Sequence, residues 1–220
     1  MDDKIISDWK RVARAKAEVE LLNVYKGLPI IYKAVVEKVE SDTVVVRVPT
    51  YEAICLTLTS RLTVLSQMLE EAVNANVLAA DVPHGAATLG HFRYATGQVG
   101  DRMTLRAEPK DPLAVHLTGG GRALAGTLAD LSVNGAGVLV AKDLAEGLRP
   151  RAVVRLHLPL PLTTLDLAGV VRYVRSAPAV SRVGMTFAPD AHLRAVFDYL
   201  NHRRSEILHE LRDLYQAAMA

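Results

Sequence analysis

The sequence predicts a mainly β protein: two small antiparallel β-barrels, the first of split-barrel type, with a helix at each end of the chain. Between residues 30 and 190, short runs rich in β-branched and apolar residues alternate with turn residues. The two ends instead repeat apolar residues every three or four positions, which is the spacing of a helix face. Half of the 220 residues are hydrophobic, enough to bury a core and too many for a disordered chain.

The first 24 residues are predicted to form a helix, because Ile5, Trp9, Val12, Lys16 and Val19 follow one another at spacings of three and four positions. A glycine at 27 and a proline at 29 are expected to end it. The strands expected in the first barrel are 30–38, 43–48, 53–58, 62–68, 72–79 and 88–96. The glycines at 97 and 100 are expected to lie in the linker to the second barrel.

The second barrel is expected to have six or seven strands, including 114–117, 123–130, 137–140, 151–158, 164–174 and 183–187. The triple glycine at 119–121 predicts a hairpin turn. It is no phosphate loop, since it lacks a following helix and a Gly-Lys-Ser/Thr ending. Pro159 and Pro161 are expected to bracket a loop before the next hairpin.

The C-terminal residues predict a helix that Asp190 can cap. Its a/d positions would be Leu193, Phe197, Leu200, Arg204, Ile207, Leu211 and Leu214. Two interpretations remain open: packing of the helix on its own chain, and a homodimer through a short coiled coil. On the same helix His202, Glu206 and His209 share a face, and we interpret them as solvated side chains rather than metal ligands, since no Cys partner or H-E-x-x-H pattern accompanies them.

Composition excludes several classes of function. No apolar run approaches the 18 or so residues that span a bilayer, and the acidic N-terminus lacks a signal-peptide pattern, so a cytoplasmic protein without membrane insertion is expected. The single cysteine, Cys55, cannot form an intramolecular disulfide and is expected to be a buried thiol in a strand. The net charge is only +2 and basic runs are lacking, which disfavours a nucleic-acid polymer as partner.

Two short motifs carry the functional argument. Arg102 and Arg106 are spaced R-x-x-x-R, and Asp130, Ser132 and Gly135 follow as D-x-S-x-x-G. A guanidinium can donate two parallel hydrogen bonds to guanine O6 and N7 or bind a phosphate, and a carboxylate accepts from the guanine N–H groups. Ser132 would add a polar contact, and Gly135 would let the backbone approach a flat ring.

Turn chemistry between the last two motif residues adds one further expectation. Asn134 tolerates the left-handed backbone conformation, so the turn before Gly135 is expected to use it. Catalysis is not expected, since Ser132 lies in L-S-V-N-G rather than in G-x-S-x-G, and paired carboxylates or a metal box do not stand out. The sequence therefore indicates a binding module rather than an enzyme.

Together the two motifs, in this order and spacing, resemble the PilZ family of cyclic di-GMP receptors. The resemblance covers residues 98–190 and ends on V-G-M-T-F at 183–187, which is similar to the closing strand of the family. Many relatives carry further arginines beside the first Arg, whereas here its neighbours are Asp101 and Met103, so one or two bound ligands remain open. Residues 21–36 are similar to the start of the regulatory barrel that precedes PilZ domains in two-domain flagellar-brake proteins.

The resemblance implies three segments: an N-terminal helix plus regulatory barrel at 1–97, a PilZ domain at 98–190 with its R-x-x-x-R linker at 98–107, and a C-terminal helix at 191–220. It implies a bacterial second-messenger receptor that binds cyclic di-GMP, needs no other cofactor or metal, and signals to a partner protein by changing its interdomain arrangement. Motility, polysaccharide export and adhesion or biofilm formation remain open as outputs. The alternative is a degenerate PilZ-like scaffold that binds proteins and no nucleotide.

Overall fold

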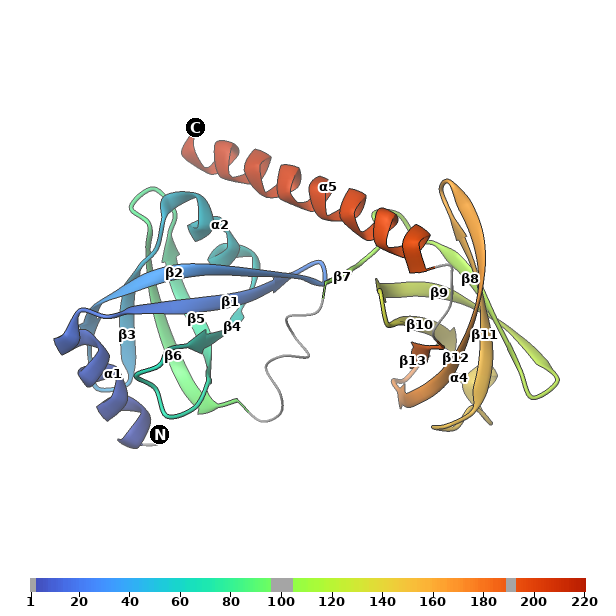
Figure 1. Cartoon of the computed structure of the whole chain (residues 1–220). Coiled ribbons are helices and arrows are strands. Elements are labelled where there is room, and N and C mark those ends of the chain that lie inside the picture. Colours follow the sequence, from blue (N-terminus) through green and yellow to red (C-terminus); the bar gives the residue numbers. More distant parts are fainter. Residues whose placement is uncertain (1–2, 96–104, 189–192) are drawn as a thin grey trace. The chain divides into compact units, whose positions relative to one another are not determined.

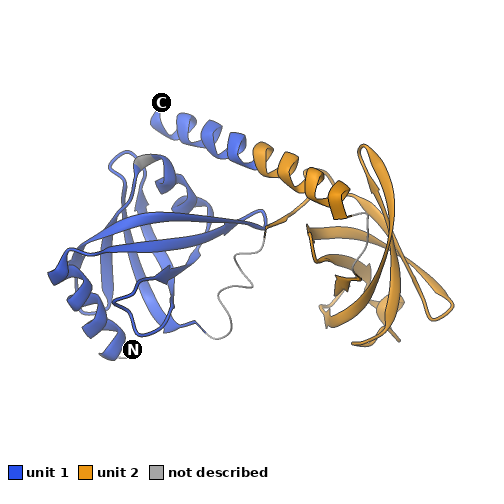
Figure 2. Ribbon diagram, viewed as in Figure 1, with its two compact units in different colours: residues 1–104, 207–220 blue, residues 105–206 orange. Residues whose placement is uncertain are grey.

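A computed structural model describes residues 3–95, 105–188 and 193–220 (Figure 1). The chain divides into two compact units, shown in different colours in Figure 2. Unit 1 comprises Met1–Thr104 and Ile207–Ala220, and unit 2 comprises Leu105–Glu206. Each unit contains an antiparallel barrel of six strands, and helices lie near both termini, so the predicted fold class is confirmed.

Unit 1 is a closed barrel in the strand order β1-β2-β3-β6-β5-β4. Its elements are α1 (Asp3–Ala15), β1 (Glu18–Tyr25), β2 (Leu28–Val39), β3 (Thr43–Arg47), α2 (Thr50–Leu58), β4 (Arg61–Leu65), β5 (Val73–Asp81) and β6 (Ala86–Tyr94). The apolar face of α1 packs against the barrel, where Trp9 is fully buried and its ring centroid lies 5.5 Å from that of Phe92. Amphipathic spacing therefore places α1 as predicted.

The N-terminal helix ends nine residues earlier than predicted, at Ala15 and not at residue 24. Lys16 takes a left-handed backbone conformation, with φ of 49°, and the chain then enters β1. Lys26 and Gly27 also have positive φ and form the two-residue hairpin between β1 and β2. Gly27 thus marks a strand hairpin rather than a helix end. Pairing of β1 with both β2 and β4 overrides the helical spacing.

The segment predicted as a strand at 53–58 is instead the end of helix α2. A short apolar run does not distinguish a buried strand from a buried helix, and here four consecutive residues, Ala53 to Leu56, are all buried. Cys55 is buried as expected, although on a helix, and this burial raises the pKa of its thiol to about 12. Other predicted strands of this barrel are present with small shifts at their ends.

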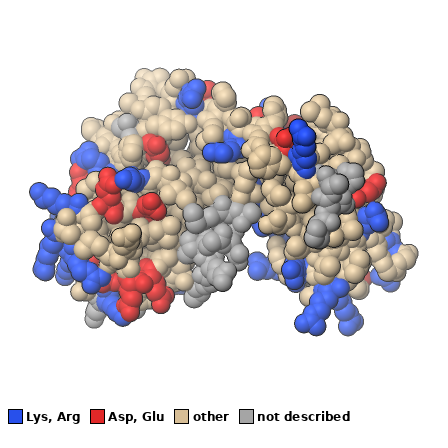
Figure 3. Space-filling model, viewed as in Figure 1, with Lys and Arg blue, Asp and Glu red and all other residues tan. Residues whose placement is uncertain are grey.

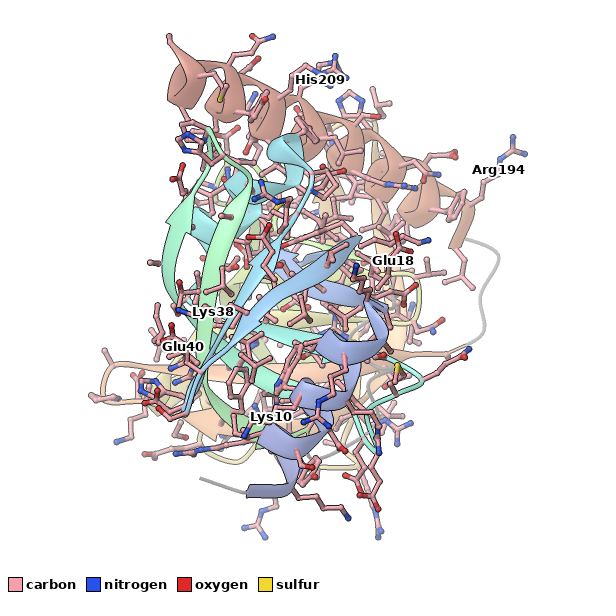
Figure 4. The ribbon with its side chains drawn as sticks, turned by 90° about the vertical axis from the view of Figure 1, so that its left-hand side faces the viewer. Lys10, Glu18, Lys38, Glu40, Arg194 and His209 are labelled. Carbon is pink, nitrogen blue, oxygen red and sulfur yellow. The ribbon has the colours of Figure 1, made fainter. Side chains whose placement is uncertain are left out.

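Charged side chains form mixed surfaces on unit 1. On the face in Figure 3, basic side chains gather over the end that carries α1, with acidic ones beside them. Lys38 and Glu40 illustrate the pattern: they lie together in Figure 4, with Nζ and Oε1 2.7 Å apart. Exposed pairs of this kind contribute little to stability.

Unit 2 is a seven-stranded sheet in the order β10-β13-β12-β11-β8-β9-β7, and the pairing of β10 with β9 closes six of these strands into a barrel. Its elements are β7 (Arg106–Ala107), β8 (Ala114–Gly119), β9 (Arg122–Ser132), β10 (Gly135–Ala141), α4 (Lys142–Ala145), β11 (Val153–Leu160), β12 (Thr163–Ser176) and β13 (Val180–Phe187). The core is aliphatic, and Leu131, Leu156 and Leu167 are fully buried in it.

The turns of unit 2 test two sequence predictions. Gly120 and Gly121 form the β8–β9 hairpin turn with φ of 58° and 73°, so the predicted glycine hairpin is confirmed. The predicted proline-bracketed loop is wrong, since Pro159 lies inside β11 opposite Thr164. A proline interrupts only one side of a strand's hydrogen bonding, and the turn itself lies after Leu160.

Helix α5 (Leu193–Met219) buries a different stripe from the predicted a/d positions. The buried side chains are Val196, Leu200, Arg203, Ile207 and Leu211. Phe197 and Leu214 are 48% and 38% exposed, and the arginine in the stripe is Arg203 rather than Arg204. Arg203 can be buried because its Nε donates to the Glu108 carbonyl, 2.9 Å away. The stripe is covered by the chain itself, whereas a homodimer stays a prediction.

Other features of α5 concern its polar face. Glu206 accepts from Arg203 at 3.1 Å and lies 3.8 Å from Lys110, so its carboxylate is committed to cations. Asp190, the predicted cap of this helix, lies outside the described residues. Among the residues that the structure describes, His, Cys, Asp and Glu side chains do not form a group of three or more that could hold a metal. None of the helices formed by the described residues combines the length and the apolarity needed to cross a membrane.

Candidate functional site

The D-x-S-x-x-G motif forms the hairpin between β9 and β10. Ser132 and Gly135 are register partners at its base, and the Ser132 hydroxyl donates to the Gly135 carbonyl at 3.0 Å. The Phe187 N–H donates to the Asn134 carbonyl at 2.8 Å, which ties the turn to β13. Asn134 does not have a positive φ, so the predicted left-handed turn residue is wrong. Hydrogen bonds from both sides fix this turn instead.

Gly135 is required by the packing of β10 against β13. A Cβ placed on Gly135 would fall on the Met185 carbonyl. Two residues later, a Cβ on Gly137 would fall on the carboxylate of Asp130. Any side chain at these two positions would therefore separate β10 from its neighbours or displace the acidic group. The approach of a flat ring to Gly135 stays a prediction.

Asp130 turns to the outer face of the barrel because β9 contains a bulge. Leu128 pairs with Val138 in the core, yet Asp130, two residues on, pairs with Gly137, so Ala129 is an extra residue in the strand. Bulges of this kind redirect side chains and are common beside functional sites. The bulge explains why the Asp130 side chain lies on the outer face, whereas those of Leu128 and Leu131 belong to the core.

The Asp130 carboxylate lies between two guanidinium groups. Arg182 on β13 donates from Nη2 to Oδ2, and Nη1 of Arg106 lies 3.2 Å from Oδ1. Asp130 is only 3% exposed, and this pairing offsets the cost of burying its charge. Oδ1 is buried and accepts no hydrogen bond from the described residues, because Arg106 is close to it without hydrogen-bond geometry. Among the described residues, Oδ1 is therefore held by an ion pair and not by a hydrogen bond.

Strand β7 brings Arg106 to this carboxylate. Arg106 pairs with Ser132, and Ala107 pairs with Leu131 and is fully buried, which anchors the short strand. The Arg106 side chain is 44% exposed. The structure thus brings together four of the five predicted site residues, Arg106, Asp130, Ser132 and Gly135, whereas Arg102 lies outside the described residues, as do the linker glycines at 97 and 100.

Two residues of this cluster escaped the sequence analysis. Arg182 comes from β13, immediately before the segment recognised as the closing strand, and only the fold shows that it faces Asp130. Gly137 continues the motif as G-x-G, and the alternation of faces along a strand could have identified it, since Gly135 and Gly137 share one face. The cluster offers an acceptor and two planar cations, which suits a ligand with N–H donors and anionic groups.

Comparison with known protein families identifies the segment that carries both motifs. A family model described as the PilZ domain matches residues 101–201, which include both motifs. Sequence comparison with curated proteins gives no significant match.

Several solved structures are similar to the chain at low identity. K. pneumonia MrkH in complex with c-di-GMP is 14% identical, with 97% of each chain covered and a TM-score of 0.45. E. coli YcgR in complex with c-di-GMP is 12% identical, with 96% of this chain and 93% of that chain covered and a TM-score of 0.45. The B. subtilis inhibitor of motility MotI is 13% identical, with 86% and 96% covered and a TM-score of 0.43.

Motif order, barrel topology and the family match agree on the same segment. Residues 101–201 of this chain belong to the PilZ domain family.

Proposed function

We propose that the protein is a receptor for cyclic di-GMP and that it binds the nucleotide at the Arg106–Asp130–Arg182 cluster. The observation that carries the proposal is the buried Asp130 carboxylate within a PilZ domain, which is paired with two arginines and whose Oδ1 accepts no hydrogen bond from the described residues. A buried acceptor without a hydrogen bond is unfavourable, and a ligand donor would satisfy it. The protein is a binding module, and no chemical step is assigned to it.

Guanine fits this acceptor through its Watson–Crick edge. Its N1–H and exocyclic amino group lie side by side and donate to a carboxylate, whereas adenine presents an acceptor in place of the N1–H. Arg106 covers Oδ1 in the structure, so the base gains access when this side chain moves aside. Arg106 can then donate to guanine O6 and N7 or to a phosphate, and Arg102 on the same segment is expected to do likewise.

Ser132 and Gly135 support the site by fixing its geometry. Ser132 is 2% exposed and its hydroxyl closes the β9–β10 turn, so it holds the end of β9 two residues after Asp130. Gly135 allows β10 to lie against β13, which carries Arg182. We assign these two residues mainly to positioning, with any direct contact to the ligand limited to the hydroxyl oxygen and the glycine backbone.

The output follows from the place of the R-x-x-x-R segment in the chain. The segment joins the first barrel to the second, so a ligand held by Arg102 and Arg106 restricts the linker and changes the interdomain arrangement. A partner protein would then bind the altered surface. A coupling free energy of about 1–3 kcal/mol is typical for such linkage. Small-angle scattering with and without cyclic di-GMP measures the rearrangement, and identical profiles at saturation would exclude it.

Titration calorimetry tests the proposal. The parent chain should bind cyclic di-GMP, and cyclic di-AMP at least tenfold more weakly, because adenine lacks the O6 acceptor and the N1–H donor. Arg106→Ala should remove most of the affinity, and Arg106→Lys should restore little, since an ammonium cannot donate in the bidentate geometry. Arg194→Ala is the matched control, because Arg194 is exposed and points away from α5 in Figure 4. Absence of heat with the parent chain would favour the degenerate scaffold.

A further inference from the structure

Two histidines face each other on the outer surface of unit 2, on two strands that carry none of the Asp130 cluster. His116 on β8 and His157 on β11 are direct register partners, and both side chains are exposed. Register partners on adjacent strands project to the same face, with their Cβ atoms about 4.5–5.5 Å apart. The two imidazole centroids lie 6.4 Å apart, and the rings are tilted by 48°. Both rings can therefore reach one ion placed between them.

A carboxylate orients one of the two rings. Asp166 on β12 is the register partner of His157 on the other side, and its Oδ1 lies 3.0 Å from Nδ1 of His157. Because a carboxylate accepts, Nδ1 carries a proton, and the lone pair of the neutral ring lies on Nε2. Histidines that ligate a metal commonly donate from their other nitrogen to such a carboxylate. Asp166, His157 and His116 thus follow one another as a carboxylate, an oriented ligand and a second ligand.

The surroundings of the histidine pair select the class of ion. The next residue of the row, Ala125 on β9, is small and exposed, so it leaves room for water beside His116. Arg155 lies two residues along β11 on the same face, and its positive charge disfavours a loosely held cation. Mg²⁺ and Ca²⁺ also require several oxygen ligands, whereas imidazole nitrogens suit zinc, copper and nickel ions. The donors therefore fit a divalent transition-metal ion.

The histidine pair lies at the end of the shortest seam between strands of this six-stranded barrel. Strands β8 and β11 share three register pairs, and the histidine pair is the last of them. Strands β11 and β12, by comparison, share eight. An ion bound to both histidines would cross-link β8 to β11 where their pairing stops. Because the site exists only in the folded chain, such binding would stabilise the barrel.

We propose that Nε2 of His157 and a ring nitrogen of His116 bind one divalent transition-metal ion, of the zinc or copper class, which clamps β8 to β11. Metal–nitrogen bonds of about 2.0–2.1 Å place two ligating ring centroids about 5 Å apart, which a modest rotation of these exposed side chains achieves. Water completes the coordination, and Asp166 acts as a positioning residue. The site has two protein ligands, fewer than a closed structural metal site. It is independent of cyclic di-GMP binding.

Titration calorimetry of the untagged, metal-free full chain with ZnCl₂ provides the first test. One ion should bind per chain. His116→Ala and His157→Ala should each weaken binding by about tenfold or more, and Asp166→Asn by about tenfold, the effect of losing the carboxylate behind a ligating histidine. His84→Ala is the matched control and should bind like the parent. Its Nδ1 is likewise paired with Asp81, at 2.9 Å, but His84 lies in the turn between β5 and β6, outside any strand.

Electron paramagnetic resonance with one equivalent of Cu²⁺ gives a readout that a purely structural role would not change. Nitrogen hyperfine structure should show two imidazole ligands in the parent and in His84→Ala, and one in each of His116→Ala and His157→Ala. Saturating Zn²⁺ should raise the melting temperature of the parent and leave that of His157→Ala unchanged.

Three results would overturn the proposal. The first is a parent chain that does not bind Zn²⁺. The second is binding that survives the double substitution of His116 and His157 by alanine, because the ion would then belong to other side chains, such as His202 and His209 on α5. The third is an ion bound at the pair without any rise in melting temperature, which would refute the clamp.

Discussion

Replacement of Asp130 by asparagine isolates the recognition of guanine. The amide keeps the size of the carboxylate but offers one acceptor and one donor in place of two acceptors, so one guanine donor meets a donor. Because Oδ1 of Asp130 is buried and accepts no hydrogen bond from the described residues, the ligand is expected to supply a charge-assisted hydrogen bond there. Losing such a bond costs about 1.5–3 kcal/mol, which is a roughly 10- to 150-fold loss of affinity.

A second ligand sharpens the test. Cyclic di-IMP lacks the exocyclic amino group and keeps the N1–H and the O6 and N7 acceptors of guanine. The parent should prefer cyclic di-GMP by about tenfold, the value of one hydrogen bond, and Asp130→Asn should shrink or reverse this preference. Titration calorimetry of both ligands against both proteins completes the cycle.

The control for this cycle is Asp166→Asn. Asp166 is an exposed aspartate on β12 that is paired with His157 at 3.0 Å, outside the cluster. It should bind both ligands like the parent. An unchanged preference in Asp130→Asn would refute the reasoning, because the carboxylate would then not contact the amino edge of the base.

Three further predictions concern the scaffold. Gly135→Val should lower the melting temperature, because the new side chain would collide with the Met185 carbonyl and overpacking costs about 1–3 kcal/mol. Calorimetric unfolding measures this change, and an unchanged melting temperature would show that the turn can adjust. Arg203→Ala should lower the free energy of unfolding by about 1.5–3 kcal/mol, because the hydrogen bond to the Glu108 carbonyl is lost. Denaturant unfolding measures this loss, and an unchanged free energy of unfolding would mean that the buried arginine makes no net contribution to stability. Burial raises the pKa of the Cys55 thiol from 9.0 to about 12, so the thiol keeps its proton in the folded chain. The stability that the protonated thiol contributes is fully present below pH 9 and should be lost as the pH rises from about 9 to 12. A thiol reagent that reacts equally fast with native and unfolded protein at pH 8 would contradict this burial.

The barrels could be predicted from the sequence because their strands are short, rich in β-branched residues and separated by strong turn signals. The hairpin at Gly120 and Gly121 is an example, since positive φ is available there without strain. Both main errors involve apolar segments whose pattern fits two elements: residues 18–25 extend a helical spacing yet pair as β1, and residues 53–56 are buried on α2. Tertiary pairing decides such segments, and local spacing does not contain that information.

The candidate site was predictable only in part for a related physical reason. Arg106, Asp130, Ser132 and Gly135 lie in recognisable motifs, and the structure brings them together. Arg182 enters the cluster through the pairing of β10 with β13, a contact far apart in sequence. The bulge that turns Asp130 outward from β9 also depends on strand register, so it cannot be seen in the sequence alone.

A crystal structure of the chain with cyclic di-GMP tests the central claim most directly. We predict one guanine with its N1–H and amino group donating to Asp130, and Arg106 displaced from Oδ1 to the base or a phosphate. A nucleotide bound elsewhere, with Arg106 still paired to Asp130, would contradict the account.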